Sequence, residues 1–353
     1  MIDFRYHLVS LISVFLALAV GIVLGAGPLR ENLGDQLAGQ VEQLRTQQDE
    51  LRTEADELAS RNEQLGSFAA EIGPELVADT LAGQKVAVLT DDSSTGPVTD
   101  RIMALLEDAG VESTVRVELK SALWVPAQSQ QRKDALDTIR SIAPNLLDGG
   151  LTDSEQLSQV IVALLAPSES GELTSELRTQ VWQALAEQQL VTIEGELPSE
   201  VDGVLFASAA PEELVDSSED EEVAAERAQS LLATQTALLT SLSEAGVPAV
   251  VSAATPLNDA STGILRTVRG DAGFDELSTT DRLQEADGPL LAVLALIEQA
   301  RGGSGAYGTT ADATDRLPAI PETAGVEDAA AEAGQNGDGT QVQGAASDGG
   351  GAE

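Results

Sequence analysis

The chain of 353 residues contains no cysteine, one histidine, His7, and two methionines, Met1 and Met103. Without cysteine it can form no disulfides, thiolate metal sites or iron–sulfur clusters, and thiol catalysis is excluded as well. Soft metal ions prefer thiolate, thioether and imidazole ligands, which this sequence nearly lacks. We therefore expect no metal site and no bound cofactor.

Basic residues are also scarce, with 19 Lys and Arg against 59 Asp and Glu and a formal net charge of -40. Such a charge repels the phosphate backbone of a nucleic acid, so nucleic-acid binding is excluded as the main function. Glycine-rich nucleotide-binding motifs and a usable catalytic histidine are missing too. The protein is predicted not to be an enzyme. A hydrolase that uses carboxylates as catalytic groups is kept as the least favoured alternative.

An apolar segment lies close to the amino terminus. No charged side chain occurs between His7 and Arg30, and the 22 residues 8–29 would rise about 33 Å as a helix, enough to cross a bilayer. We predict a single-pass anchor in the cell membrane, with residues 1–7 in the cytoplasm and the bulk of the chain outside. A cleaved signal peptide is the alternative, which Pro28 and the length of the segment disfavour.

Small residues recur every four positions within this segment, at Ala17, Gly21 and Gly25. This spacing lets two membrane helices approach closely, as in small-xxx-small dimers. Gly and Ala are also common in membrane helices in general, so the motif alone leaves both interpretations open.

A seven-residue repeat follows the apolar segment and predicts a parallel, dimeric coiled-coil stalk over residues 30–74. Asn62 falls at an a position, where it fixes register, and Gly73-Pro74 is expected to end the helix. The alternative is a single amphipathic helix packed on its own domain. The d positions of the repeat are Leu37, Leu44, Leu51, Leu58, Leu65 and Ile72.

Residues 75–300 alternate short apolar runs with amphipathic stretches, which predicts an α/β domain with a Rossmann-like or flavodoxin-like, mainly parallel sheet. Trp124 and Trp182 are expected in its core. The predicted strands are 85–90, 114–119, 190–193, 204–207 and 249–252. The predicted helices are 97–108, 131–142, 153–165, 174–188, 221–245 and a last one to 300 that Asp287 caps.

Residues 301–353 contain few large apolar side chains and are rich in Gly, Ala, Asp and Glu. A segment of this composition forms no core of its own. We therefore predict a disordered, acidic tail.

The loop Asp91–Gly96 follows the first predicted strand, at the place where doubly wound proteins bind ligands. Two adjacent carboxylates repel phosphate, however, and a metal would need further ligands from other strands. A solvated loop with capping Ser and Thr side chains is favoured.

Four stretches resemble the actinobacterial MctB family, named for mycobacterial copper transport protein B. They are DFRYHLVS at 3–10 with VFLALAVGIVLG at 14–25, and STTD at 278–281 with GGSGAYG at 302–308. A cluster of Ser, Thr and Asp before a helix is also typical of a capping loop, which is the favoured interpretation of STTD. The motif residues of unknown role are Ser278, Thr279, Asp281, Gly305, Tyr307 and Gly308.

The resemblance implies a cell-envelope protein involved in copper transport or copper homeostasis, with an outer-membrane location by the family name only. It assigns no metal ligand in this chain. For corynebacterial relatives it implies a part in cell separation and cell-wall remodelling. The alternative function is therefore a non-enzymatic, dimeric scaffold or regulator of a cell-wall (peptidoglycan) enzyme, with that enzyme or another envelope protein as partner.

Overall fold

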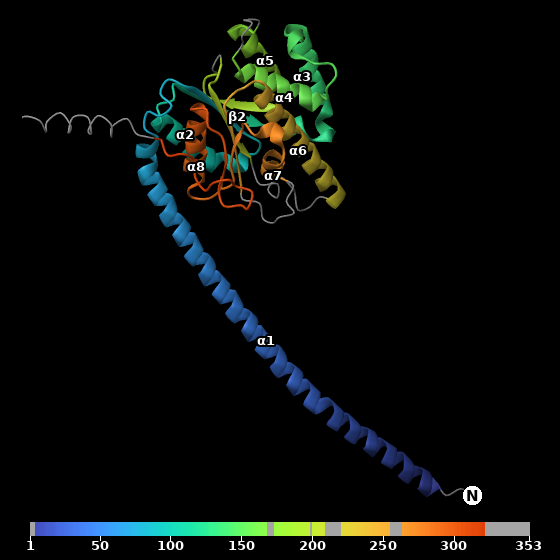
Figure 1. Ribbon diagram of the computed structural model, residues 1–353. Coiled ribbons are helices and arrows are strands. Elements are labelled where there is room, and N and C mark those ends of the chain that lie inside the picture. The colour runs from blue at the N-terminus through green and yellow to red at the C-terminus, as the bar shows by residue number, and fades with distance from the viewer. Residues whose placement is uncertain (1–3, 168–172, 198–199, 209–219, 255–262, 322–353) are drawn as a thin grey trace, which may run out of the picture. The chain divides into compact units, whose positions relative to one another are not determined.

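The computed structural model describes residues 4–167, 173–197, 200–208, 220–254 and 263–321 (Figure 1). For residues 4, 24–38 and 221 it describes the backbone alone. The chain divides into two units, residues 1–64 and residues 65–353, and each is considered by itself.

The first unit consists of the larger part of helix α1 (Phe4–Val77). Its segment Arg5–Val23, with a mean hydropathy of 2.3, is long and apolar enough to cross a membrane. By length and composition it agrees with the predicted span 8–29. The coiled coil and the dimer stay predictions.

The predicted helix stop at Gly73-Pro74 is wrong, because α1 continues to Val77. A proline inside a helix removes a hydrogen-bond donor and ordinarily costs about 3 kcal/mol. Here the last turns of α1 pack onto the domain. Val77 is fully buried, and Gly73 lets Leu105 and Leu290 approach the helix backbone. This packing outweighs the local preference for a stop.

Seven strands of the second unit form one sheet in the order β3-β2-β1-β4-β5-β6-β7. All neighbours are parallel except β3, which runs antiparallel to β2 at one edge, so the predicted mainly parallel sheet is confirmed. The order 3-2-1-4-5-6 is that of Rossmann-type sheets, whose winding reverses between β1 and β4. The strands are β1 (Lys85–Thr90), β2 (Ser113–Leu119), β3 (Val191–Glu194), β4 (Gly203–Ser208), β5 (Ala249–Ala253), β6 (Ser278–Thr280) and β7 (Ala306–Tyr307).

Helices cover both faces of the sheet because its strands carry apolar side chains on both sides. In β1, Val86 and Val88 belong to one core and Ala87 and Leu89 to the other, as the alternation of side chains along a strand requires. Helices α2 and α8 cover the first face, and α3 to α7 cover the second. Their bounds are Gly96–Asp108 (α2), Ser129–Ile142 (α3), Asp153–Leu165 (α4), Ser175–Glu187 (α5), Glu221–Glu244 (α6), Ile264–Gly270 (α7) and Gly288–Ala300 (α8).

The elements with clear apolar patterns are confirmed within one or two residues of their predicted bounds, and both tryptophans are buried. The sequence did not predict β6, β7 and α7. Strand β6 reads STT and lacks apolar residues, yet it is completely buried, because its hydroxyls find partners. Thr280 Oγ1, for example, donates to Ser252 Oγ of β5 at 2.6 Å.

The folded domain extends beyond the predicted boundary at residue 300. Tyr307 of β7 is buried in the core beneath α2 and α8, and the segment after it pairs back through a bridge between Tyr307 and Asp315. The structure describes the chain as far as residue 321. The predicted start of the tail at residue 301 is therefore wrong. The rest of the predicted tail, residues 322–353, lies outside the described residues.

Candidate functional site

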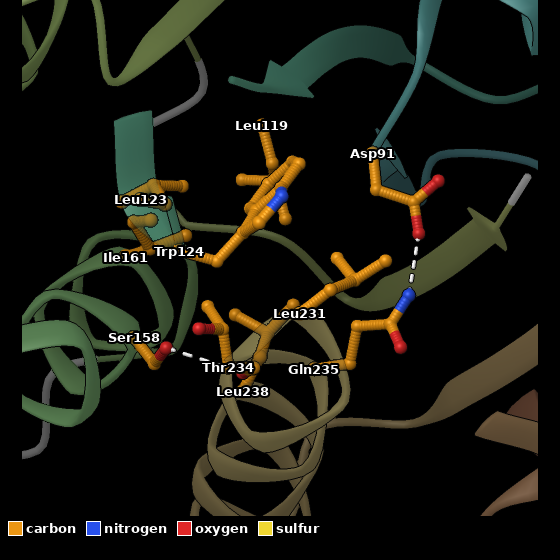
Figure 2. A pocket seen from close by; sticks show the side chains of 10 residues that line it. All are labelled: Asp91, Leu119, Leu123, Trp124, Ser158, Ile161, Leu231, Thr234, Gln235 and Leu238. Atoms are coloured by element: carbon orange, nitrogen blue, oxygen red, sulfur yellow. Dashed lines mark hydrogen bonds between the residues drawn. The ribbon is translucent and has the colours of Figure 1, made fainter. Parts of the chain in front are cut away.

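A buried polar cluster lies where the winding of the sheet reverses. Asp91 directly follows β1, Ser208 ends β4 and Gln235 comes from α6, and all three side chains are buried. Asp91 Oδ2 accepts a hydrogen bond from Ser208 Oγ at 2.6 Å. It accepts a second one from Gln235 Nε2 at 2.7 Å (Figure 2). Gln235 Nε2 also lies 3.1 Å from Ser208 Oγ, so one carboxylate joins two strands and a helix.

The loop that starts with Asp91 is only in part the solvated loop that the sequence predicted. Asp92 does cap a short 3₁₀ turn, because its Oδ1 accepts from Ser94 N at 2.7 Å. Thr95 Oγ1 donates to the Asp92 carbonyl at 2.7 Å and is buried. Asp91, by contrast, is only 3% exposed. The solvated interpretation is wrong for Asp91, because the donors on β4 and α6 replace its water.

The space beside this cluster is small. A cavity of about 10 Å³ is lined by Asp91, Trp124, Gln235 and mostly apolar neighbours from β2, α4 and α6 (Figure 2). Such a volume holds about one water molecule. Among the residues that the structure describes, the cluster works as an internal polar tie, and the cavity beside it is too small for an organic ligand.

The family-motif residues, far apart in the sequence, meet at the edge of the sheet formed by β6 and β7. Ser278 and Thr279 lie in β6, so the predicted capping loop is wrong at these positions. Asp281 follows β6 with a fully buried side chain, and it accepts hydrogen bonds from Thr309 N and Thr310 N at 3.0 Å. It does not cap α8, whose N-cap residue is Asp287.

Arg269 of α7 completes this cluster, although no sequence motif singled it out. Its side chain is 4% exposed and lies 3.2 Å from Asp281 Oδ2. Its Nε donates to Thr279 Oγ1 at 2.8 Å, and a terminal nitrogen donates to the Tyr307 carbonyl at 2.9 Å. Burial raises the pKa of Asp281, but hydrogen bonds from Thr310 and Thr309 and the charge of Arg269 outweigh it and leave the pKa lowered.

The three remaining motif residues fit the same cluster. Gly308, at φ 137°, lies against the Asp281 carboxylate, where a Cβ atom has no room. A Cβ atom at Gly305 would lie 2.5 Å from the Tyr307 hydroxyl, which donates to Glu298 Oε2 at 2.6 Å. Burial, together with this hydrogen bond and the Glu298 charge, raises the pKa of Tyr307. We call Arg269, Ser278, Thr279, Asp281, Tyr307 and Thr310 the Asp281 clip.

The Asp281 clip fastens the end of the domain to the sheet. It draws on α7, β6, β7 and the segment after β7, and its charged groups are satisfied within the protein. The sequence signal for Arg269 is weak: Arg266 and Arg269 are the charged residues of α7 and lie among apolar ones, and a charged side chain that becomes buried is ordinarily paired.

The described residues contain no group of three or more His, Cys, Asp or Glu side chains that could hold a metal ion. Met103 of α2 is partly buried and packs against the core beneath α2 and α8.

The residues predicted to mediate dimerisation all lie on α1. Ala17, Gly21 and Asn62 are exposed, and Ile72 is half-buried. Gly25 and Leu37 fall outside the residues whose side chains are described. The seam residues that remain are 57–65% exposed; these are Leu44, Leu51, Leu58 and Leu65.

Fold and site together define a Rossmann-type α/β domain carried on a long amino-terminal helix that has one candidate membrane span. A family described as "Copper transport outer membrane protein, MctB" matches residues 1–318 of this chain. The chain belongs to the MctB family, as the motifs predicted.

Similar proteins include the copper transporters MctB of Mycobacterium bovis and of two Mycobacterium tuberculosis strains. Each is 28% identical to this chain over 200 residues, a region that makes up 54% of this chain. The matched region spans 62% of the length of each relative.

Proposed function

We propose that this chain is a membrane-anchored envelope protein that serves copper transport without supplying the copper ligands itself. Membership of the MctB family and the name of the Mycobacterium relatives support the copper-related role. The apolar segment Arg5–Val23 supports the anchor by its length and composition. In this proposal residues 1–7 lie in the cytoplasm and the α/β domain lies outside the cytoplasmic membrane.

The observation that carries the indirect role is the shortage of copper ligands. Cu(I) is held by thiolates, thioethers and imidazoles. The whole chain offers His7, at the edge of the apolar segment, and the methionines Met1 and Met103. Met103 packs in the core, so its thioether serves as an apolar filler there.

The same proposal makes the protein a non-enzymatic homodimer joined through its stalk. The exposed leucine seam of α1 supports this, since large apolar side chains in a regular row are stabilised by a second helix.

Titration of the full chain in detergent with Cu(I), in competition with a chromogenic chelator, tests the indirect role. We expect no stoichiometric complex. Weak Cu(II) adsorption to the acidic surface should disappear in salt, because salt screens it. A stoichiometric Cu(I) complex that survives the competing chelator would overturn the proposal.

Deletion of the gene in the bacterium that encodes the protein tests the copper role itself. We expect a change in copper tolerance that the parent chain restores. The variant Met103→Leu should restore it equally, because leucine fills the same core space without a sulfur ligand. Unchanged tolerance on deletion removes the copper role, and failure of Met103→Leu alone would mark Met103 as a ligand.

A further inference from the structure

Helices α4 and α6 lie side by side on one face of the sheet (Figure 1), and an open groove of about 550 Å³ runs along their outer surfaces. The residues of α6 that line it are spaced by three and four positions between Gln229 and Glu244. This spacing places them on one face of the helix. The lined face is about 22 Å long, the length of four helical turns. We call this surface the α4–α6 groove.

Several α6 side chains that line the α4–α6 groove are short and present no free polar group. Ala233 and Ala237 carry only methyl groups. Two hydroxyls are turned back onto the helix: Thr236 Oγ1 donates to the Leu232 carbonyl at 2.7 Å, and Ser241 Oγ donates to the Ala237 carbonyl at 3.0 Å. Because these hydroxyls already donate to backbone carbonyls, they do not need a hydrogen-bond acceptor from water or from a partner. Short side chains also let the ridge of a second helix settle deeply.

The charged residues that line the groove are both acidic, Glu155 and Glu244. Glu155 belongs to the capping box of α4, where its Oε2 accepts from Thr152 N at 2.8 Å. Hydrogen bonds from the backbone and side chain of Thr152 lower the pKa of Glu155, so this carboxylate is ionised and fixed in place. A basic group is absent from the residues that line the groove.

We propose that the α4–α6 groove receives an amphipathic helix of a partner protein that carries Lys or Arg beside its apolar face. Helix-in-groove docking uses side chains spaced by three and four residues, which is the spacing that α6 presents. The segment 322–353 of this chain contains no Lys or Arg, and a second copy of α6 brings the same glutamate. Like charge therefore disfavours both as occupants.

Photocrosslinking in the bacterium that encodes the protein tests this proposal in the full chain. p-Benzoylphenylalanine is placed at Gln229, on the rim of the groove, and in a matched control at Gln180, an exposed glutamine of α5 outside the groove. The expected result is a protein adduct at Gln229 alone. Its crosslinked peptide, identified by mass spectrometry, should be an amphipathic helical segment with Lys or Arg.

A second variant tests the charge argument. Glu155→Gln with Glu244→Gln removes both charges, and Gln keeps the capping box of α4. We expect the adduct yield to fall roughly two- to tenfold, since exposed ion pairs are weak. The melting temperature should fall by no more than about 4 °C, because Glu155→Gln loses a charge that the N-terminus of α4 favours. Adducts to other copies of this chain, an adduct peptide without basic residues, or equal yields at Gln229 and Gln180 would each overturn the proposal.

Discussion

The backbone of Gly308 lies directly against the carboxylate of Asp281, and this contact leaves no space for a side chain at position 308. We expect Gly308→Ala to lower the free energy of unfolding by roughly 2–5 kcal/mol, because it strains the backbone and displaces a buried, hydrogen-bonded carboxylate. Denaturant unfolding of the detergent-solubilised chain measures the change. Gly270→Ala is the control, since a Cβ atom there meets nothing within 4 Å. Equal stability of the two variants would contradict the steric argument.

The ion pair of the Asp281 clip makes a separate prediction. Asp281→Asn leaves the buried guanidinium of Arg269 with the half-exposed Asp312 as its carboxylate partner. Removal of one member of a buried pair costs about 3–5 kcal/mol, and we expect a loss of this size in the free energy of unfolding at pH 7. Asp312→Asn, at the exposed end of the same network, should cost less than 1.5 kcal/mol, a rough bound for exposed pairs.

The pH dependence of that loss follows from the lowered pKa of Asp281. A carboxylate whose folded pKa is lowered stabilises the protein above its unfolded pKa of about 3.9, and this contribution disappears as the pH falls through the folded pKa. The stability difference between the parent and Asp281→Asn should be constant from about pH 8 to pH 5 and shrink below about pH 4. A difference that already shrinks between pH 7 and pH 5 would show a raised pKa instead.

Asp91 and Asp92 are adjacent in sequence but should respond differently to the same substitution. Asp91→Asn weakens the acceptor that holds Ser208 and Gln235, and we expect a loss of about 1–3 kcal/mol in the free energy of unfolding. Asp92→Asn keeps a good capping residue and should change the stability by less than about 0.5 kcal/mol. Similar losses for both variants would argue against a buried tie at Asp91.

Oligomeric state tests the stalk. Residues 30–353 should be dimeric by light scattering at tens of micromolar, and Leu51→Ala with Leu58→Ala should give monomers, because both leucines lie on the exposed seam. Thr53→Ala with Ser60→Ala changes the opposite side of α1 and should leave the dimer intact. A monomeric parent would refute the coiled coil.

Reporter fusions after Glu71 test the membrane topology. Alkaline phosphatase at this point should be active in a bacterial host, and a reporter that works only in the cytoplasm should be silent, because the predicted topology exports everything beyond the anchor. The reverse pattern would place the domain inside the cell. Amino-terminal sequencing that starts at Pro28 would show a cleaved signal peptide.

The sequence could predict the parts of the fold that are determined locally, by a run of apolar residues or by a glycine at the end of a helix. KVAVLT was recognised as a buried strand, and Gly110 and Gly246 end α2 and α6 with positive φ angles, as a helix terminator should. Strand β6 escaped because its burial depends on partners outside its own segment: Thr279 bonds to Arg269 of α7, ten residues earlier. The three residues of β6 by themselves do not indicate such a partner.

The candidate site shows the same limit. Asp91 and Asp92 cannot be distinguished in the sequence. Asp91 is buried because it accepts hydrogen bonds from Ser208 and Gln235, which lie 117 and 144 residues further along the chain. The motif residues could be collected by resemblance to a family. Their common role depends on the pairing of β6 with β7 and on Arg269, which donates hydrogen bonds to both strands.

The place of β7 at the edge of the sheet also affects how the protein is made. A ribosome delivers β1, β2, β4 and β5 first, and these strands form contiguous parallel pairs without help from later residues. Until residue 307 has emerged, however, β6 is an open edge and Arg269 is without the carbonyl of Tyr307. A chain that stalls or is cut before this point therefore exposes a polar strand edge, the kind of surface through which unfinished proteins aggregate or attract proteases.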